Sequence, residues 1–317
     1  MKVLVTGGAG FIGSNLVLSL IHNGHTVTVI DNLSTGFRRH LSEFESTGAL
    51  HLIVGDLRNA ECALKEVSNV DVVVHLAANA DIRFGWNHPR EDTQQNLIVT
   101  QNVLEAMRCN NVKRLVFAST GSVYNNTAII PTPETSATSR QHSLYGASKI
   151  AAEALISAYA EAGYVQATIF RLVSVLGPHY SHGHVFDFVK QLHNNPKELL
   201  VLGNGNQRKS YIHVVDCVSA IESCLEVSPT FQVYNLGIDD YCTIRDSANW
   251  ITSEMGVSPS INTGTDDFGW VGDLPFVYLD TSSIRSTGWR TTKTIEQSVR
   301  ATVRWLLEHD WILSERN

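Results

Sequence analysis

Tyr145 and Lys149 are four residues apart in the stretch LYGASKIAAEAL, which has helical spacing. Side chains at this spacing project from one face of a helix, so the phenol and the ammonium are expected to lie close together. A phenol has a reference pKa of about 10 and is a poor base at neutral pH. A nearby positive charge stabilises the phenolate and lowers that pKa. The pair could therefore act as a general base, although Tyr and Lys at this spacing are also common as a plain surface contact.

Three hydroxyl side chains stand at the end of the apolar run in RLVFASTGSVY. Ser119, Thr120 and Ser122 thus lie at the carboxyl end of a predicted strand, where open α/β sheets bind their ligands. Thr120 could bridge a substrate hydroxyl and the Tyr145 phenolate. Gly121 and Ser122 follow it directly, so no carboxylate is available at this point of the chain.

A glycine-rich turn connects the first apolar run to a helical segment in VLVTGGAGFIGSNL. Gly7 allows the tight turn, Gly10 lets the backbone approach a pyrophosphate, and Gly13 lets the helix pack closely on the strand. The phosphates then face a helix N-terminus, whose N–H groups and dipole favour anions. Asp31 ends the second apolar run, where a carboxylate binds the ribose hydroxyls and repels a 2′-phosphate. The predicted cofactor is therefore NAD rather than NADP.

Asp56 ends the third apolar run, in IVGDL. Its carboxylate could contact the adenine of a dinucleotide. It could equally be the N-cap of the helix predicted for NAECALKEV. The residues alone leave the two interpretations open.

The elements that must position these residues alternate along the first half of the chain. Buried apolar runs separated by helical segments predict a parallel sheet covered on both faces. The predicted strands are 2–7, 26–31, 50–56, 70–78, 112–120, 166–175 and 231–237, with helices at 13–24, 94–111 and 144–163. The fold class is α/β, a doubly wound parallel Rossmann sheet with a smaller α/β C-terminal region that looks rich in loops. We expect one domain at 1–173 with about 213–250, and the other at 174–212 with 251–317.

Bulk properties exclude several classes of protein. The 317 residues carry a net charge of −7, with no basic stripe, which argues against nucleic acid as the main partner. The five cysteines form no C-x-x-C pair, as is typical of reduced thiols in the cytoplasm. No signal peptide is expected, because a strand begins within two residues. No apolar run reaches the ~20 residues of a membrane span.

At this point the chain resembles a family, the extended short-chain dehydrogenase/reductases, and within it the nucleotide-sugar epimerases of the UDP-glucose 4-epimerase type. The matching motifs cover nearly the whole chain: TGGAGFIG, DNLSTG, GDL, HLAA, ASTGSVY, YGASK, GNGNQRKSYIHVVD and GWVGDLP. The resemblance implies that the first domain binds NAD and the second binds a nucleotide sugar. It also implies a catalytic set of Thr120, Tyr145 and Lys149.

The resemblance further implies two groups of binding residues. The residues around NAD are Gly7, Gly10, Phe11, Ile12, Gly13, Asp31, Asn32, Ser34, Thr35, Gly36, Asp56, Leu57, Leu76, Ala77, Ala78, Asn96, Ser119, Tyr145, Lys149 and Val173. The residues toward the substrate are Thr120, Ser122, Tyr145, Ser174, Arg208, Lys209, Trp270 and Asp273. Asn96 could instead be a packing residue inside its helix.

The implied reaction is epimerisation at the sugar C4. Tyr145 removes the proton of the 4-hydroxyl while the C4 hydride passes to NAD, and the hydride returns to the other face of the 4-keto sugar. Dehydratases of the family carry an acidic pair after the catalytic Thr, and the decarboxylases carry a Glu. Gly121 and Ser122 therefore favour a 4-epimerase acting on UDP-glucose/UDP-galactose or their N-acetyl forms. The alternatives are a 4-ketoreductase or dehydrogenase, a 4,6-dehydratase-like enzyme, and a non-catalytic NAD sensor.

Four positions depart from the 4-epimerase pattern. Asn125 replaces a glycine, Ser174 replaces an asparagine, and Lys209 and Trp270 each stand where an arginine is usual. Lys209 keeps a point charge for a phosphate but loses the bidentate fork of arginine. These changes bear on the base and the sugar that the protein binds rather than on the fold or the cofactor.

Two further features bear on metals and partners. PHYSHGH offers His179, His182 and His184 as metal ligands, but a substrate-covering loop is favoured, because the resembled family uses no metal. The alanine-rich helix at 144–162 could pair with the helix at 94–107 in a two-fold, four-helix interface. We therefore expect a cytoplasmic homodimer that uses a UDP-sugar or another nucleotide sugar, without nucleic-acid or membrane partners.

Overall fold

The structure is a computed structural model, and it describes residues 1–124, 127, 129–138, 140–227, 229–269, 273–274 and 276–316. The chain forms two compact units. The first unit comprises 1–125, 137–172 and 218–234, and the second comprises 126–136, 173–217 and 235–317. These units are defined by packing. The expected division by ligand, 1–173 with about 213–250 against 174–212 with 251–317, therefore stays a prediction.

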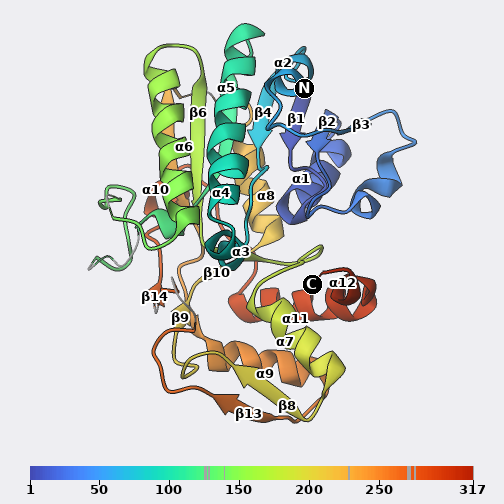
Figure 1. Cartoon of the computed structure of the whole chain (residues 1–317), viewed down its shortest axis with the longest axis vertical. Helices are drawn as coiled ribbons and strands as arrows, with labels where there is room; N and C mark the ends of the chain where they lie inside the picture. The colour runs from blue at the N-terminus through green and yellow to red at the C-terminus, as the bar shows by residue number, and fades with distance from the viewer. Residues whose placement is uncertain are drawn as a thin grey trace. The chain divides into compact units, whose positions relative to one another are not determined.

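A seven-stranded sheet is the centre of the first unit (Figure 1). Its strand order is β11-β6-β5-β4-β1-β2-β3, and the pairs from β6 to β3 are parallel. This order confirms the predicted doubly wound Rossmann fold. The strands are β1 (Lys2–Thr6), β2 (Thr26–Asp31), β3 (Leu50–Val54), β4 (Val72–His75), β5 (Arg114–Thr120), β6 (Gln166–Leu172) and β11 (Phe231–Leu236).

Helices connect these strands and cover the sheet. Apolar side chains of α2, α5 and α6 form one core with the strands, and the largest of them include Met107 and Ile156. Figure 1 shows α5 and α6 side by side over this face. The helices are α1 (Phe11–His22), η1 (Arg38–Phe44), α2 (Ala60–Glu66), α3 (Ile82–Asn87), α4 (Pro89–Asp92), η2 (Thr93–Ile98), α5 (Val99–Cys109), η3 (Gly121–Tyr124), α6 (Leu144–Glu161) and α8 (Val214–Ser223).

The helix predicted at 94–111 has an irregular start. Residues Thr93–Ile98 form a π-helical segment, η2, between α4 and α5. Such segments are rare and often occur at functional sites. Asn96, one of the predicted cofactor residues, lies in this segment.

The second unit is richer in regular structure than the sequence indicates. Its strands are β7 (Ser174–Leu176), β8 (Glu198–Val201), β9 (Arg208–Lys209), β10 (Tyr211–His213), β12 (Cys242–Thr243), β13 (Ser260–Thr263) and β14 (Phe276–Val277). Its helices are α7 (His184–Asn194), α9 (Ile244–Met255), α10 (Ser282–Ser286), α11 (Ile295–Glu308) and α12 (Trp311–Glu315). The prediction of a loop-rich region was therefore wrong for the amphipathic helices α9 and α11.

The strand predicted at 166–175 is in fact two strands. β6 ends at Leu172, and β7 begins at Ser174 and pairs with β10 in a separate two-stranded sheet. The physical reason is that an apolar run shows burial, whereas the sheet that each part joins depends on partners far away in the sequence.

Candidate active site

The glycines of the turn after β1 and of the start of α1 have no room for a side chain. Gly7 has a φ of +70°, and a Cβ placed there would lie 2.8 Å from the Ala77 backbone. A Cβ on Gly13 would lie 2.2 Å from the Gly7 carbonyl oxygen. No side chain caps the N-terminus of α1, and its first turn holds no acidic residue. A backbone cradle at an uncapped helix N-terminus fits the pyrophosphate of a dinucleotide.

Asp31 lies buried at the carboxyl end of β2, the position predicted for a ribose-binding carboxylate. One of its oxygens accepts a hydrogen bond from Ala9 N at 2.9 Å, and the other accepts one from Leu33 N at 2.8 Å. Burial raises the pKa of Asp31, and these two N–H groups oppose the rise. The carboxylate is thus held in one orientation by the glycine turn and by its own strand end. Nearby, Asn32 accepts hydrogen bonds from the Ser34 amide and hydroxyl.

Asp56 is not the N-cap of α2. Asn59 caps that helix by accepting hydrogen bonds from Glu61 N and Cys62 N. The Asp56 carboxylate instead binds the Arg58 guanidinium, with an oxygen 2.6 Å from Nη2, and this contact lowers the pKa of Asp56. Its role toward adenine stays a prediction, as does that of its neighbour Leu57, which is buried.

The segment after β4 is anchored through Thr6. The Thr6 hydroxyl accepts hydrogen bonds from Leu76 N and Ala77 N, and it is 2.6 Å from His75 Nδ1. His75 Nε2 is 3.0 Å from the Thr100 hydroxyl. Burial lowers the pKa of His75 to about 3, so the ring is neutral. This buried series of hydrogen bonds fixes the backbone of the segment that contains the predicted cofactor residues Leu76, Ala77 and Ala78.

The predicted catalytic residues come together at the carboxyl end of β5. The Tyr145 hydroxyl lies close enough to Thr120 for that hydroxyl to influence its pKa. The Thr120 hydroxyl itself donates to Ser122 Oγ at 3.2 Å and accepts from Ser122 N at 3.1 Å. Lys149 is 2% exposed, and its Nζ donates to the Ala118 carbonyl at 2.9 Å. Thr120, Tyr145 and Lys149 therefore occupy one neighbourhood within the first unit.

The pKa of Tyr145 differs from the sequence-based expectation. Burial around the hydroxyl raises it to about 12, the nearby Thr120 hydroxyl opposes this rise, and Asp92 adds to it. Burial lowers the pKa of Lys149 to about 8, while Glu153 and Asp92 oppose that fall. The expected lowering by Lys149 is not found: Lys149 is not among the groups that shift the Tyr145 pKa, and burial dominates because the phenolate loses its hydration.

A buried ion pair next to this set was not predicted. Glu153 lies one turn beyond Lys149 on α6 and binds Arg171 of β6 through both carboxylate oxygens, with Oε2 2.6 Å from Nη2. Ser119 donates to the same carboxylate, and Arg171 donates to the Tyr124 hydroxyl at 2.9 Å. The predicted cofactor residue Ser119 is thus engaged by the protein itself. The only sequence signal for Glu153 is its i+4 spacing from Lys149.

Asn96 is a connecting residue inside the first unit. Its Oδ1 accepts from Asn79 N at 2.8 Å, and its Nδ2 donates to the Ser148 hydroxyl at 2.9 Å. Neither of the two expectations, a cofactor contact or simple packing, anticipated this pair of bonds. A direct contact with NAD stays a prediction.

The substrate residues expected in the second unit form two sets. Lys209 binds Asp273, with Nζ 2.6 Å from the carboxylate, and it also donates to the Leu274 carbonyl. The Arg208 guanidinium lies 3.9 Å from the centroid of the Phe276 ring and 5.7 Å from that of Tyr241. Arg208 is exposed and makes no ion pair with a described residue. Arg208, rather than Lys209, is therefore the cation of this pair that remains available to an anion.

The remaining predicted residues are placed as follows. Ser174 is exposed at the start of β7, and Val173 is buried. Trp270 and Asn125 lie outside the described residues. His184 contacts Ser247 and Tyr211, His179 packs on Trp305, and His182 stacks on Tyr180. In the described part of the chain, no group of three or more His, Cys, Asp or Glu side chains could hold a metal ion.

Comparison with known proteins defines the class. Residues 3–237 match the NAD dependent epimerase/dehydratase family. A crystal structure of UDP-galactose 4-epimerase is 35% identical, with a TM-score of 0.88 over 98% of this chain and 100% of that chain. UDP-glucose 4-epimerase of Thermus thermophilus, solved with NAD, is 30% identical, with a TM-score of 0.86 over 97% and 99%.

A dehydratase is also similar. The dTDP-glucose 4,6-dehydratase DesIV of Streptomyces venezuelae, a double mutant with NAD and DAU bound, is 25% identical, with a TM-score of 0.91 over all of both chains. The chain therefore belongs to the NAD-dependent epimerase/dehydratase family. It is an enzyme of that family with NAD as its cofactor, which confirms the predicted cofactor and the resemblance. No helix in the described residues is long and apolar enough to cross a membrane.

Proposed function

We propose that this enzyme is an NAD-dependent nucleotide-sugar 4-epimerase that acts on UDP-glucose/UDP-galactose or on their N-acetyl forms. The observation that carries the proposal is the carboxyl end of β5. Thr120 lies next to Tyr145 there and is hydrogen-bonded to Ser122, and Gly121 and Ser122 follow without a carboxylate. Elimination of water from a keto sugar needs an acid and a base at this place, whereas epimerisation does not.

The chain's own residues divide the work of this reaction. Bound NAD supplies a reversible hydride acceptor. Tyr145 takes the proton of the sugar 4-hydroxyl and later returns it to the 4-keto oxygen. Thr120 holds that hydroxyl against the phenol. The Lys149 ammonium, fixed by the Ala118 carbonyl, is the positive charge on the same helix face.

The nucleotide end of the substrate is assigned to the second unit. Arg208 is proposed to bind a phosphate oxygen, because its guanidinium lies over the Phe276 ring and makes no ion pair with a described residue. Ser174, Lys209, Asp273 and Trp270 remain proposed substrate residues.

Feeding the purified enzyme nucleotide sugars without added cofactor tests the proposal. We expect it to carry NAD and to convert UDP-galactose or UDP-N-acetylgalactosamine into the 4-epimer. Failure to form an epimer from any nucleotide sugar would refute the proposed function. A 4-keto-6-deoxy product would instead indicate a dehydratase, like the similar enzyme from Streptomyces venezuelae. Stoichiometric accumulation of NADH would indicate a dehydrogenase, and binding without turnover would indicate a sensor.

The proposal includes a cytoplasmic homodimer built on α5 and α6. Ala154 and Ala158 are exposed on α6, with Ile150 and Leu155 half-buried beside them. A stripe of this kind suits close helix packing. All five cysteines are free thiols, in keeping with a reducing compartment. Light scattering tests the dimer, and a monomeric mass would rule it out.

A further inference from the structure

Asp92, the last residue of α4, is a buried carboxylate that the proposed mechanism does not use. It is 1% exposed. Its Oδ1 accepts a hydrogen bond from Asn79 Nδ2 at 2.8 Å. Its Oδ2 accepts none from any residue that the structure describes. A buried carboxylate with one unsatisfied oxygen costs stability, so its presence points to a function.

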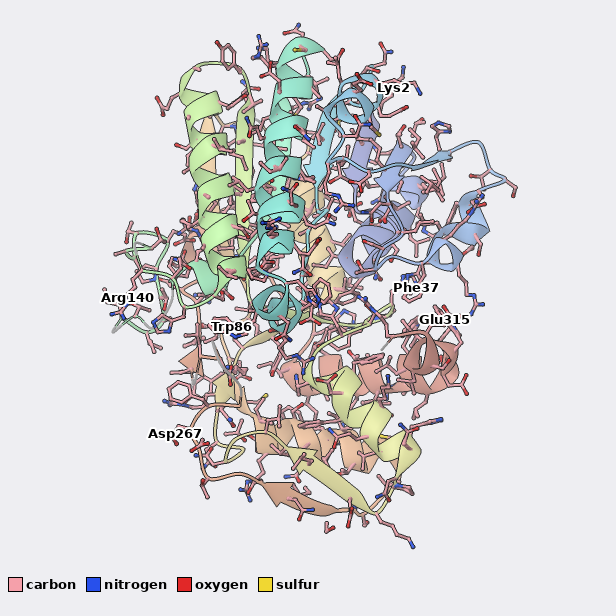
Figure 2. All side chains as sticks on the ribbon, in the orientation of Figure 1. Lys2, Phe37, Trp86, Arg140, Asp267 and Glu315 are labelled. Carbon is pink, nitrogen blue, oxygen red and sulfur yellow. The ribbon has the colours of Figure 1, made fainter. Side chains whose placement is uncertain are left out.

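Gly85 of α3 makes the room for this carboxylate. A Cβ on Gly85 would lie 2.1 Å from Asp92 Oδ2. Helix α3 packs against both α4 and α6 within the first unit. Its next residue, Trp86, is half exposed and is labelled in Figure 2. The carboxylate thus lies under a helix that only a glycine allows to approach this closely.

A chain of hydrogen bonds leads from Asp92 to the catalytic helix. Asn79, just after the Leu76–Ala78 segment, binds Asp92 with its side chain and Asn96 with its backbone N–H. Asn96 Nδ2 donates to the Ser148 hydroxyl at 2.9 Å. Ser148 in turn donates to the Tyr145 carbonyl at 2.8 Å, in the first turn of α6.

Asp92 is also one of the few charges that act on the catalytic pair. The charged groups that act on Asp92 itself are Lys149, Asp81 and Glu91. Those that act on Lys149 are Glu153 and Asp92, whereas Tyr145 is influenced by Thr120 and Asp92. A negative charge on Asp92 therefore opposes ionisation of Tyr145 and favours the ammonium of Lys149.

We propose that Asp92 is a positioning residue of this site. Through Asn79, Asn96 and Ser148 it fixes the first turn of α6 against the segment that follows β4, and it places one negative charge behind Tyr145 and Lys149. The inference deepens the proposed function and rests on it only for the effect on turnover.

Asp92→Asn tests the charge, because an asparagine keeps the Oδ1 acceptor for Asn79. The measurement is a titration of Tyr145 by ¹³Cζ-tyrosine NMR, with Tyr145→Phe to assign its resonance. We expect the Tyr145 midpoint to fall by about one pH unit. Glu91→Gln, which removes the adjacent and more accessible carboxylate, is the matched control and is expected to leave the midpoint in place. An Asp92→Asn shift no larger than that of Glu91→Gln would overturn the proposal.

A second variant covers the case in which Asp92→Asn does not fold. Ser148→Ala keeps the Asp92 charge and removes the hydroxyl through which this series of hydrogen bonds reaches the Tyr145 carbonyl. Amide hydrogen exchange in the first turn of α6 is expected to speed up by about fivefold, since one buried hydrogen bond contributes about 1 kcal/mol. Exchange as slow as in the wild type would overturn the positioning role. Neither readout requires a sugar substrate, so an enzyme that turns over no nucleotide sugar would defeat the proposed function and still allow both tests.

Discussion

Glu153 lies one turn beyond Lys149 on α6, yet its carboxylate binds Arg171 through both oxygens, whereas the Lys149 ammonium bonds to the Ala118 carbonyl. The carboxylate therefore acts on Lys149 through space, and its negative charge opposes the lowering of the Lys149 pKa by burial. A structural ion pair and the charge of a proposed catalytic residue are linked in this way.

Glu153→Gln is expected to move the alkaline limb of the pH profile of kcat down by about one unit, because Lys149 then loses its proton more easily. The same change leaves Arg171 buried without a counter-charge and costs about 3–5 kcal/mol of stability. The double variant Glu153→Leu with Arg171→Met separates the two effects, since it removes both charges. It should recover most of the stability and keep the shifted limb. An unmoved limb in both variants contradicts the prediction.

Tyr145→Phe is expected to lower kcat by roughly 10²–10⁴-fold, because the proton acceptor is lost. NAD content after purification should stay at the wild-type level, since the glycine turn and Asp31 are untouched. Tyr159→Phe, on the same helix but bonded to Glu105, is the control and should retain full activity. Loss of activity in both variants would point to helix packing instead.

Lys149→Met should abolish turnover and raise stability. Burial lowers the folded-state pKa of Lys149 to about 8, from 10.5, so the charged form costs the folded state about 3 kcal/mol. That cost is full below about pH 8 and fades as the pH rises to about 10.5, where both states are neutral. The Tm gain of the variant should therefore be largest at neutral pH and shrink toward pH 10.5. Lys113→Met, at an exposed position, is the control; an equal gain there contradicts the prediction.

Arg208→Ala is expected to raise the KM for the nucleotide sugar by roughly 10–100-fold, the worth of one charge-assisted hydrogen bond. The kcat should change little, and NAD content should not change. Arg304→Ala removes an exposed arginine that binds Glu254 and serves as the control. An unaltered KM would contradict the prediction and would indicate that another residue binds the phosphate, with Lys209 the first to examine.

Acid should destabilise the first unit through His75. Its folded-state pKa is about 3, while an unfolded histidine titrates near 6.5. The unfolded chain thus binds the extra proton, so stability is present above about pH 6.5 and is lost as the pH falls toward 3. His75→Gln, which can still bond Thr6 or Thr100, should flatten this loss in chemical denaturation measured at a series of pH values. His51→Gln, at an exposed position, should leave the dependence of stability on pH as in the wild type. The same dependence in His75→Gln as in the wild type would refute the prediction.

The sequence predicted the parts of the site that local spacing determines. Tyr145 and Lys149 share a helix, and Gly7 and Gly13 share one turn, so neither pair depends on a distant partner. Arg171 and Glu153 are 18 residues apart, on different elements, and their contact follows from the packing of α6 on β6. The bond between Asn79 and Asp92 could not be predicted either, because Asn79 follows β4 and Asp92 ends α4, and no local spacing relates the two.

Other misses have similar causes. Asp56 and Asn59 are both good N-caps, and only the true start of α2 selects Asn59. The pKa of Tyr145 could not be inferred from its charged neighbour, since burial dominates it. Lys209 resembles a phosphate ligand in the sequence, but Asp273, far along the chain, occupies it.

The position of β11 next to β6 has a consequence for synthesis of the chain. β6 is a buried, apolar strand, and its second neighbour in the sheet is made only after residues 173–230 have been added. Until then the nascent chain presents β6 as an open edge, of the kind that pairs with other chains. The sheet whose strand β5 ends at Thr120 therefore depends on late-emerging sequence to close its edge, and truncations before β11 should aggregate rather than yield a smaller nucleotide-binding domain.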